Sequence, residues 1–411
     1  MSSEGSPVLA APPPALFTHR PYLYCVAARG FSELAYQMVA VALGWQIYAM
    51  TLSAFALGMV GLAQFLPSAL LVFAAGHVAD RYDRTKVVQV CQIIQALVAG
   101  FLAWGTFAGW LTAPQIFWAV GVLGAASAFE SPASGALLPA VVPEGLLQRG
   151  TAFSSGVHQL AAISGPALGG VVYAISPGVP YAAMAVLCLA AAGLNAAIRL
   201  ERPAMAKEPP TLRDLFAGAA FVRQNPAILG TISLDLFAVL LGGATALLPI
   251  YAHDILKTKA WGLGALRAAP SVGALLMTAV LARHSIQRRA GMRMFQAVIV
   301  FGLATVVFSL SHWFWLSLLA LIIMGAADMV SVVIRISLVQ LATPDAMRGR
   351  VSAVNYLFIN ASNQLGEFES GITAAMFGAM PAALLGGLGT IAVALLWMKL
   401  FPKLREVERL E

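Results

Sequence analysis

Charged residues are scarce in this sequence. Asp, Glu, Lys and Arg make up 10% of its 411 residues, whereas a soluble domain carries about 25%. Hydrophobic residues reach 60%, which is more apolar surface than a soluble core of this length can hide. The apolar runs are also too long for the short alternating segments of a membrane β-barrel. We therefore predict an all-α polytopic membrane protein.

Cysteine is nearly absent too. Cys25, Cys91 and Cys188 all lie inside apolar runs, so we expect no disulfide framework, no metal site and no cofactor. The first 20 residues lack the charged start and apolar run of a cleaved signal peptide. We expect a disordered tail there, with insertion directed by the first helix.

Twelve stretches are long enough to cross a bilayer, which takes about 20 mostly apolar residues. A polar, proline-rich segment followed by a short amphipathic pattern divides them into six and six. The predicted helices are 22–49, 53–79, 87–108, 113–139, 150–175, 180–198, 227–252, 262–283, 293–310, 313–340, 351–376 and 381–401. The predicted organisation is a tail (1–20), a first six-helix bundle (21–198), a linker with an amphipathic surface helix (199–226), a second bundle (227–401) and a tail (402–411).

The two groups of helices repeat each other weakly. At an offset of 201, residues 124–126 match residues 325–327, and Arg149 matches Arg350 without a gap. Two pseudo-symmetric bundles around a central cavity are a transporter architecture, in which the substrate site lies between the repeats near the middle of the membrane.

Cations mark the orientation of the helices. Of the 25 Lys and Arg residues, 20 fall in alternate loops or tails, and the short loops near Thr51, Trp110, Pro177 and Pro381 carry none. By the positive-inside rule the side with the Lys- and Arg-rich loops is cytoplasmic, and we expect both termini there. The basic balance thus reflects topology, and we expect no nucleic-acid partner because no cation cluster is interleaved with aromatic residues.

The loop from Gly76 to Lys86 reads GHVADRYDRTK. Its charges stay on one side of the bilayer, because each costs several kcal/mol to carry through hydrocarbon. The pattern G-x-x-x-D-R-x-x-R-x-K resembles the loop between helices 2 and 3 of the major facilitator superfamily. That resemblance implies a glycine at a close helix approach and an acid that meets a neighbouring helix end. Asp83 stands where the family usually has a second glycine, which predicts a different turn.

We predict a gating role for Asp80. A helix predicted to begin just after Arg350 presents unpaired N–H groups and a positive dipole end. We expect Asp80 to latch there, or on Arg350, when the cytoplasmic side closes, with Arg149 as the matching cation of the first bundle. In the second repeat the position of Asp80 is Arg283, so the latch belongs to the first half alone. The predicted gating residues are Gly76, Asp80, Arg81, Arg84, Arg149 and Arg350.

Ionisable residues inside the predicted helices each need a partner or a water-filled cavity, because insertion costs at least about 2.5–3.5 kcal/mol near the centre. Arg29 and Glu33 share a helical face and can pair. Glu130 has no cation beside it, so it suits a proton carrier. The predicted substrate or proton-coupling residues are Arg29, Glu33, Glu130, Asp235, Arg267, Asp328, Arg335 and Glu367.

Plainer interpretations stay open for these residues. The Arg29–Glu33 pair can be structural, and Asp235 can be a gate contact. Asp328 and Arg335, two turns apart on one face, are expected to reach across the cavity to the first bundle.

Three further positions have alternatives as well. Arg267 replaces Gln64 of the first repeat, which favours a specific role. Glu367 and Glu369 point in different directions, so at most one faces the cavity. His158 fits a neutral, hydrogen-bonded histidine between helices better than a titrating group.

The segment Gly165-Pro166-Ala167-Leu168-Gly169-Gly170 resembles the G-P-x-x-G-G signature of superfamily antiporters that export drugs. Small residues let helices pack backbone to backbone, and proline frees a carbonyl for bending. Ordinary tight packing is the alternative.

Residues 81–84, 235–244, 247–252 and 266–270 are similar to the enterobactin-exporter branch of the superfamily. The resemblance implies proton-driven efflux of a siderophore or similar amphipathic molecule across a bacterial inner membrane by alternating access. We expect Arg29, Arg267 and Arg335 to contact an anionic catecholate or carboxylate group, and Tyr36, Phe65, Phe129 and Tyr356 to supply apolar cavity surface.

Two rivals remain. Cavity amides suit an importer or uniporter of a small polar solute. A membrane enzyme or receptor lacks support, because the sequence has no metal spacing, no nucleophile–base arrangement, no phosphate loop and no extramembrane domain. We therefore expect a non-enzymatic monomer whose partners are a small-molecule substrate, protons and the lipid bilayer. The amides are Gln37, Asn355, Asn360, Asn363 and Gln364.

Overall fold

The chain is described by a computed structural model that covers residues 16–143, 145–198, 212–284 and 289–408. Within these ranges the side chains of Asp80, Tyr356 and Asn360 lie outside the described residues. The described part is helical and contains no strand, which confirms the predicted fold class. Its main elements are α1 (Arg20–Thr51), α2 (Ala54–Arg81), α3 (Arg84–Ala108), α4 (Ala113–Val141), α5 (Leu147–Ile175), α6 (Val179–Ala196), α7 (Leu212–Gln224), α8 (Pro226–Leu241), α9 (Leu248–Ile250), α10 (Ala260–Arg283), α11 (Ala290–Leu310), α12 (Phe314–Leu341), α13 (Asp345–Phe377) and α14 (Ala379–Leu400).

Nine spans of the described part are long and apolar enough to cross a membrane. The helices α1, α5 and α13 are equally long but carry more polar residues, and they run among the other nine. This arrangement is consistent with the twelve predicted crossings. Helix α13 begins at Asp345, six residues before the sequence placed it.

Helix ends follow local polar chemistry. Asp83 precedes α3 and accepts from the Thr85 N–H at 3.0 Å, so its side chain caps the start of the helix. Thr112 and Gln115 form a reciprocal capping box at the start of α4. Gly109, with φ of 72°, ends α3 in the left-handed region.

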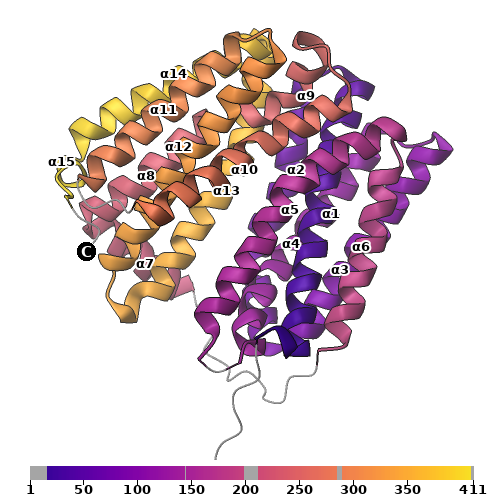
Figure 1. Cartoon of the computed structure of the whole chain (residues 1–411), viewed down its shortest axis with the longest axis horizontal. Helices are drawn as coiled ribbons and strands as arrows, with labels where there is room; N and C mark the ends of the chain where they lie inside the picture. The colour runs from indigo at the N-terminus through magenta and orange to yellow at the C-terminus, as the bar shows by residue number, and fades with distance from the viewer. Residues whose placement is uncertain (1–15, 144, 199–211, 285–288, 409–411) are drawn as a thin grey trace, which may run out of the picture.

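The helices form two halves (Figure 1). In the first half α1 packs on α5 and α6, and α3 packs on α4 and α6. In the second half α12 packs on α10 and α11, while α14 packs on α8 and α11. The halves meet through two long pairs, α2 with α13 and α5 with α10. The ribbons of the two halves diverge from there toward the lower part of Figure 1.

One predicted helix is not continuous. The stretch predicted as 227–252 is α8, then Gly242 and Gly243, a 3-10 turn (Ala244–Leu247), α9 and a π-helical turn (Tyr251–Ile255). A Cβ on Gly243 would lie 2.5 Å from Ser370 Oγ and 2.7 Å from the Gly366 carbonyl oxygen. The break therefore lets α13 pack directly on the backbone, which only glycine permits.

The two ends of the molecule differ. We call the end with Arg81, Arg84 and Arg283 the basic end, and the opposite end the closed end, because the halves contact each other there. At the closed end a Cβ on Gly371 would lie 2.5 Å from Gly58 Cα. In the second pair of helices that joins the halves, α5 with α10, a Cβ on Gly170 would lie 2.5 Å from the Ala260 carbonyl oxygen.

Helix α7 occupies the position where the sequence predicted an amphipathic helix. It packs on α13 and α8. Val222 is buried there beside Ile228, Val351 and Val354. The described apolar face of α7 therefore covers the basic end of the second half.

Candidate functional site

A cluster of polar residues lies between the halves, and we call it the central cluster. Its first members come from α1 and α5. Glu33 Oε2 lies 3.4 Å from His158 Nδ1, and Gln37 Nε2 donates to Glu33 Oε1 at 2.7 Å. The expected Arg29–Glu33 pair is wrong. Arg29 Nη1 instead donates to Ser154 Oγ at 3.5 Å, because the packing of α5 on α1 offers both residues partners on α5.

The remaining members come from α2, α10 and α13. Gln64 Nε2 donates to the Tyr36 hydroxyl at 2.7 Å. Arg267 of α10 and Glu367 of α13 lie within electrostatic range of that hydroxyl and of each other. Gly61 is close enough to α13 that a Cβ on it would meet Glu367 Oε2 at 3.0 Å. The cluster is therefore built by both halves.

These side chains are accessible although they lie far from the helix ends. The side chain of His158 is 55% exposed, and Tyr36 is 39% exposed. On α13, Gln364 Oε1 lies one turn before Glu367 and is buried without a hydrogen-bond partner in the described part. The region thus combines a phenol, two carboxylates, an arginine, a histidine and one unused acceptor. Such a surface can bind a partly charged, partly aromatic molecule.

Glu130 belongs to a different network inside the first half. Its two carboxylate oxygens accept from Gln92 Nε2 at 3.1 Å and from Gln95 Nε2 at 2.7 Å. Gln92 also donates to Ser32 at 2.9 Å and accepts from Asn195 at 2.9 Å. The carboxylate is thus held by amides from α3. Sequence reasoning missed these partners, although two glutamines three residues apart in an apolar run are a detectable signal.

The predicted charges of the second half also meet each other. Arg335 Nη1 of α12 donates to Asp235 Oδ2 of α8, and both side chains are buried. The expectation that Arg335 reaches the first half is wrong, because α8 packs against α12 and supplies a carboxylate nearer by. Asp328 forms no hydrogen bond or ion pair with any residue that the structure describes. It lines a cavity of about 10 Å³ with Asp235 and Ser331.

A group at the closed end was missed by sequence reasoning. The Tyr48 hydroxyl of α1 donates to Asp254 of the π-helical turn. His253 Nδ1 lies 2.6 Å from Asp254 Oδ1, and the rings of Trp45 and Tyr48 pack on His253 at 5.5 and 5.7 Å. We call these residues the closed-end latch because they join the halves. A His-Asp pair ending an apolar run was the available signal.

The predicted gating residues lie at the basic end. Arg81 is exposed, and Arg84 Nη1 donates to the Ala136 carbonyl of α4 at 3.4 Å. Gly76 was expected at a close helix approach, and this is wrong for the present conformation. A Cβ on Gly76 would meet nothing within 4 Å, because the halves diverge at this end. The side chain of Asp80 lies outside the described residues, so its latch stays a prediction.

The two repeat-related arginines are also at the basic end. Arg149 is exposed in the first turn of α5. Arg350 is exposed near the start of α13, where its Nη1 lies 3.6 Å from Met347 Sδ. A Cβ on Gly218 of α7 would lie 2.8 Å from the Arg350 carbonyl oxygen. Helix α7 thus packs against the helix start on which the Asp80 hypothesis depends.

The glycines of the segment 165–170 all have close neighbours. A Cβ on Gly165 would meet Gln37 Cβ at 2.5 Å, and one on Gly169 would meet the Met38 carbonyl at 2.5 Å. The Pro166 carbonyl oxygen lies 2.5 Å from where a Cβ on Gly264 would be. Gly165 and Gly169 therefore face α1, whereas Pro166 and Gly170 face α10. The motif packs α5 against both halves.

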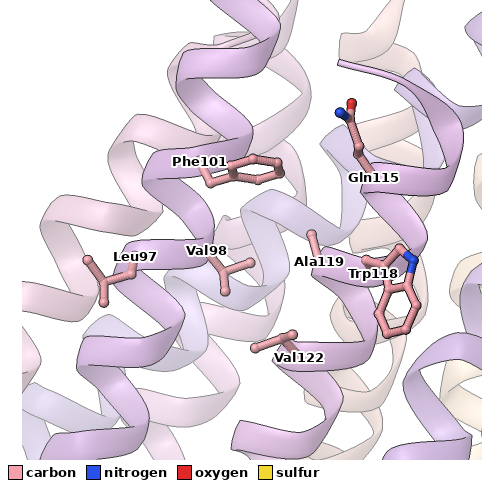
Figure 2. Close-up of a pocket in the computed structure, with 7 residues that line it drawn as sticks. All are labelled: Leu97, Val98, Phe101, Gln115, Trp118, Ala119 and Val122. Carbon is pink, nitrogen blue, oxygen red and sulfur yellow. The ribbon is translucent and has the colours of Figure 1, made fainter. Parts of the chain in front are cut away.

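A pocket of about 360 Å³ lies between α3 and α4, away from all these charges (Figure 2). Trp118 on its rim is 78% exposed. The pocket is lined by apolar side chains and one amide, so it is a membrane-facing groove and not part of the central cluster. Its lining residues are Leu97, Val98, Phe101, Gln115, Trp118, Ala119 and Val122.

Comparisons with known proteins agree with this architecture. A protein of Citrobacter koseri named Enterobactin exporter EntS is 28% identical over 95% of this chain and 94% of its own length. The Enterobactin exporter EntS of Escherichia coli O1:K1 is 28% identical over 92% of this chain and 87% of its own.

Solved structures share the fold. The nucleoside transporter NupG superposes with a TM-score of 0.73 at 14% identity, over 93% of this chain and 99% of that one. A bacterial homolog of the human lysosomal transporter Spinster, inward-facing and unoccupied, gives 0.71 at 12% identity, over 94% and 96%. The family model described as Major Facilitator Superfamily matches residues 25–367. This chain therefore belongs to the major facilitator superfamily of membrane transporters.

Proposed function

We propose that this transporter exports a siderophore or a similar amphipathic anion across the bacterial inner membrane, in exchange for protons, by alternating access. The observation that carries the proposal is the central cluster. It joins residues of both halves, so a molecule bound there would contact both and could bias their relative position.

The chemistry of the central cluster favours an anionic, partly aromatic substrate. Arg267 lies within electrostatic range of the Tyr36 hydroxyl, and Arg29 has a 3.5 Å hydrogen bond to Ser154. Arg335 is already neutralised by Asp235, so we assign anion binding to Arg29 and Arg267 alone. The oxygens of a catecholate would accept hydrogen bonds from the arginines, and N–H or O–H groups elsewhere on the substrate would donate to the unpartnered Gln364 Oε1. Relatives at 28% identity that are named enterobactin exporters support this class.

The charge distribution supports an orientation. If the basic end is cytoplasmic, as the positive-inside rule requires, then both described chain ends lie on that side. The contacts between the halves at the closed end then seal the outer side, and the central cluster is reached from the cytoplasm. This is the state in which an exporter loads its substrate.

Transport into proteoliposomes tests the proposal. With an imposed pH gradient, we expect accumulation of catecholate siderophores within a panel that also contains drugs and small polar solutes. A protonophore should abolish the accumulation. A deletion strain should retain siderophore inside the cell. Transport of polar solutes alone, or a deletion strain with an import defect, would favour the importer instead.

The substitution Arg267→Gln restores the residue of the first repeat at this position. We expect it to weaken siderophore binding by about tenfold, corresponding to a lost charge-assisted hydrogen bond of about 1.5–3 kcal/mol partly replaced by the amide. Arg283→Gln, at the exposed end of α10, is the matched control and should bind normally. If both variants bind the siderophore equally well, Arg267 is not part of the substrate site.

A further inference from the structure

We propose that the core of the second half holds a proton site, in which Asp328 is the proton acceptor and a buried water links it to Ser331 and the Asp235–Arg335 pair. This inference rests on the proposed proton coupling and assigns it to one location, apart from the central cluster. Ser331 enters as a positioning residue that sequence reasoning did not single out.

The spacing of the residues on α12 supports the site. Asp328, Ser331 and Arg335 lie at positions i, i+3 and i+7, which fall on one face of a helix. Side chains on a helix lean toward its N-terminus, so the Arg335 side chain leans toward Ser331 and Asp328. The face is therefore a continuous polar stripe in an otherwise apolar helix.

Two buried polar atoms on the stripe have hydrogen-bonding capacity that no described residue uses. Ser331 Oγ and Arg335 Nε are buried and have no hydrogen-bond partner in the described part of the chain. Both residues are less than 5% exposed. An unsatisfied buried polar group costs about 1–3 kcal/mol, and buried waters usually satisfy such groups.

The cavity beside the stripe has room for one water molecule. Its volume is about 10 Å³, near the lower limit for holding a water. Asp235, Asp328 and Ser331 line it together with apolar residues of α8, α11 and α12. A water there would have the two to four polar partners that it needs.

The charges around Asp328 favour a proton over a metal ion. From α8 the facing group is Asp235, which Arg335 neutralises. From α11 the facing residues are Ala297, Val298 and Phe301, none of which titrates. Helix α10 packs on α12 through Pro270 and Gly325, and its Arg267 lies at the central cluster instead.

The charge balance then decides the ligand. An ionised Asp328 leaves this group with one net negative charge in a low-dielectric interior, and a single proton removes it. A metal ion would need more oxygen ligands than the three residues provide and would be repelled by Arg335. The proton adds to a carboxylate oxygen, and no other bond changes.

The location suits coupling. Asp328 lies midway along α12, and the Asp235–Arg335 pair lies between it and the basic end. The helix that carries Asp235 is broken at Gly242 and Gly243, so α8 can move separately from the turn that follows it. Protonation of Asp328 would remove the charge that competes with Asp235 for Arg335, and the pair would tighten.

Infrared titration of the full chain in lipid nanodiscs, without substrate, tests the site. The protonated-carboxyl C=O band of the wild type should be lost in Asp328→Asn and kept in Glu369→Gln, whose native side chain bonds within α13. Ser331→Ala keeps every carboxylate and should shift the band, because the water loses a partner. A band that survives Asp328→Asn overturns the site. If that variant does not fold, an unshifted band in Ser331→Ala overturns it.

Transport separates this inference from the proposed function. In proteoliposomes, Asp328→Asn should still exchange labelled for unlabelled catecholate siderophore, while its accumulation driven by a pH gradient falls to the level with protonophore. If the wild type ignores the gradient but keeps the Asp328 band, proton coupling fails and the site stands. If gradient-driven transport survives Asp328→Asn, the site fails and proton coupling stands.

Discussion

The contact between α2 and α13 at the closed end makes one substitution diagnostic. In the present conformation a Cβ on Gly371 would lie 2.5 Å from Gly58 Cα and 2.7 Å from Gly58 N. These are backbone atoms, so no side-chain rotation relieves the overlap. Gly371→Ala must therefore push the two helices apart. In the proposed alternating-access cycle these helices separate in the other conformation, where the added methyl group costs nothing.

The size of the effect follows from overpacking energies. Inserting a methyl group into a tight contact costs about 1–3 kcal/mol. The better helix propensity of alanine, worth about 1 kcal/mol, acts in both conformations and cancels. At about 2 kcal/mol the equilibrium between the conformations shifts about 30-fold, since each 1.4 kcal/mol is a factor of ten.

Spin labels on the two halves measure this shift. Leu52 in the first half and Trp313 in the second are exposed at the closed end, and the three native cysteines are buried. We expect the label separation to lengthen in Gly371→Ala. Gly100→Ala is the control, because a Cβ there meets nothing within 4 Å. An unchanged distance distribution in correctly folded Gly371→Ala would refute the reasoning.

Three further predictions concern the closed end, the Glu130 network and the basic end. Tyr48→Phe removes the hydrogen bond to Asp254 and should weaken the closed end by about 1 kcal/mol, seen as longer separations of the same spin labels. Gln95→Leu leaves one Glu130 oxygen without its donor, so the thermal unfolding midpoint should fall, for a loss of about 1–3 kcal/mol. Asp80→Asn should reach the membrane at normal levels but transport poorly, and undiminished transport would reject the latch.

The membrane class and the doubled bundle could be predicted from the sequence, because both depend on composition and spacing along one dimension. Apolar runs of about 20 residues identify spans whatever they later contact. The candidate site residues could be identified in the same way, because charged residues stand out in an apolar run. Examples are Arg29, Glu130, Asp235 and Asp328.

The partners of those charges could not be predicted. Helical spacing places Glu33 beside Arg29 on one face, but the packing of α5 brings His158 to Glu33 and Ser154 to Arg29. Spacing also left open where Arg335 points, and the packing of α8 on α12 brings it to Asp235. The break at Gly242 and Gly243 was hidden because glycine is common in membrane helices.

The sequence by itself determined that this chain is a helical membrane protein and which of its charged residues interrupt apolar runs. Only the tertiary structure decided which charges meet, where the halves touch, and that Asp328 lacks a partner within the described residues. The physical reason is that insertion into hydrocarbon is settled by each segment's own polarity. Pairing, packing and cavities are settled by contacts between segments far apart in the chain.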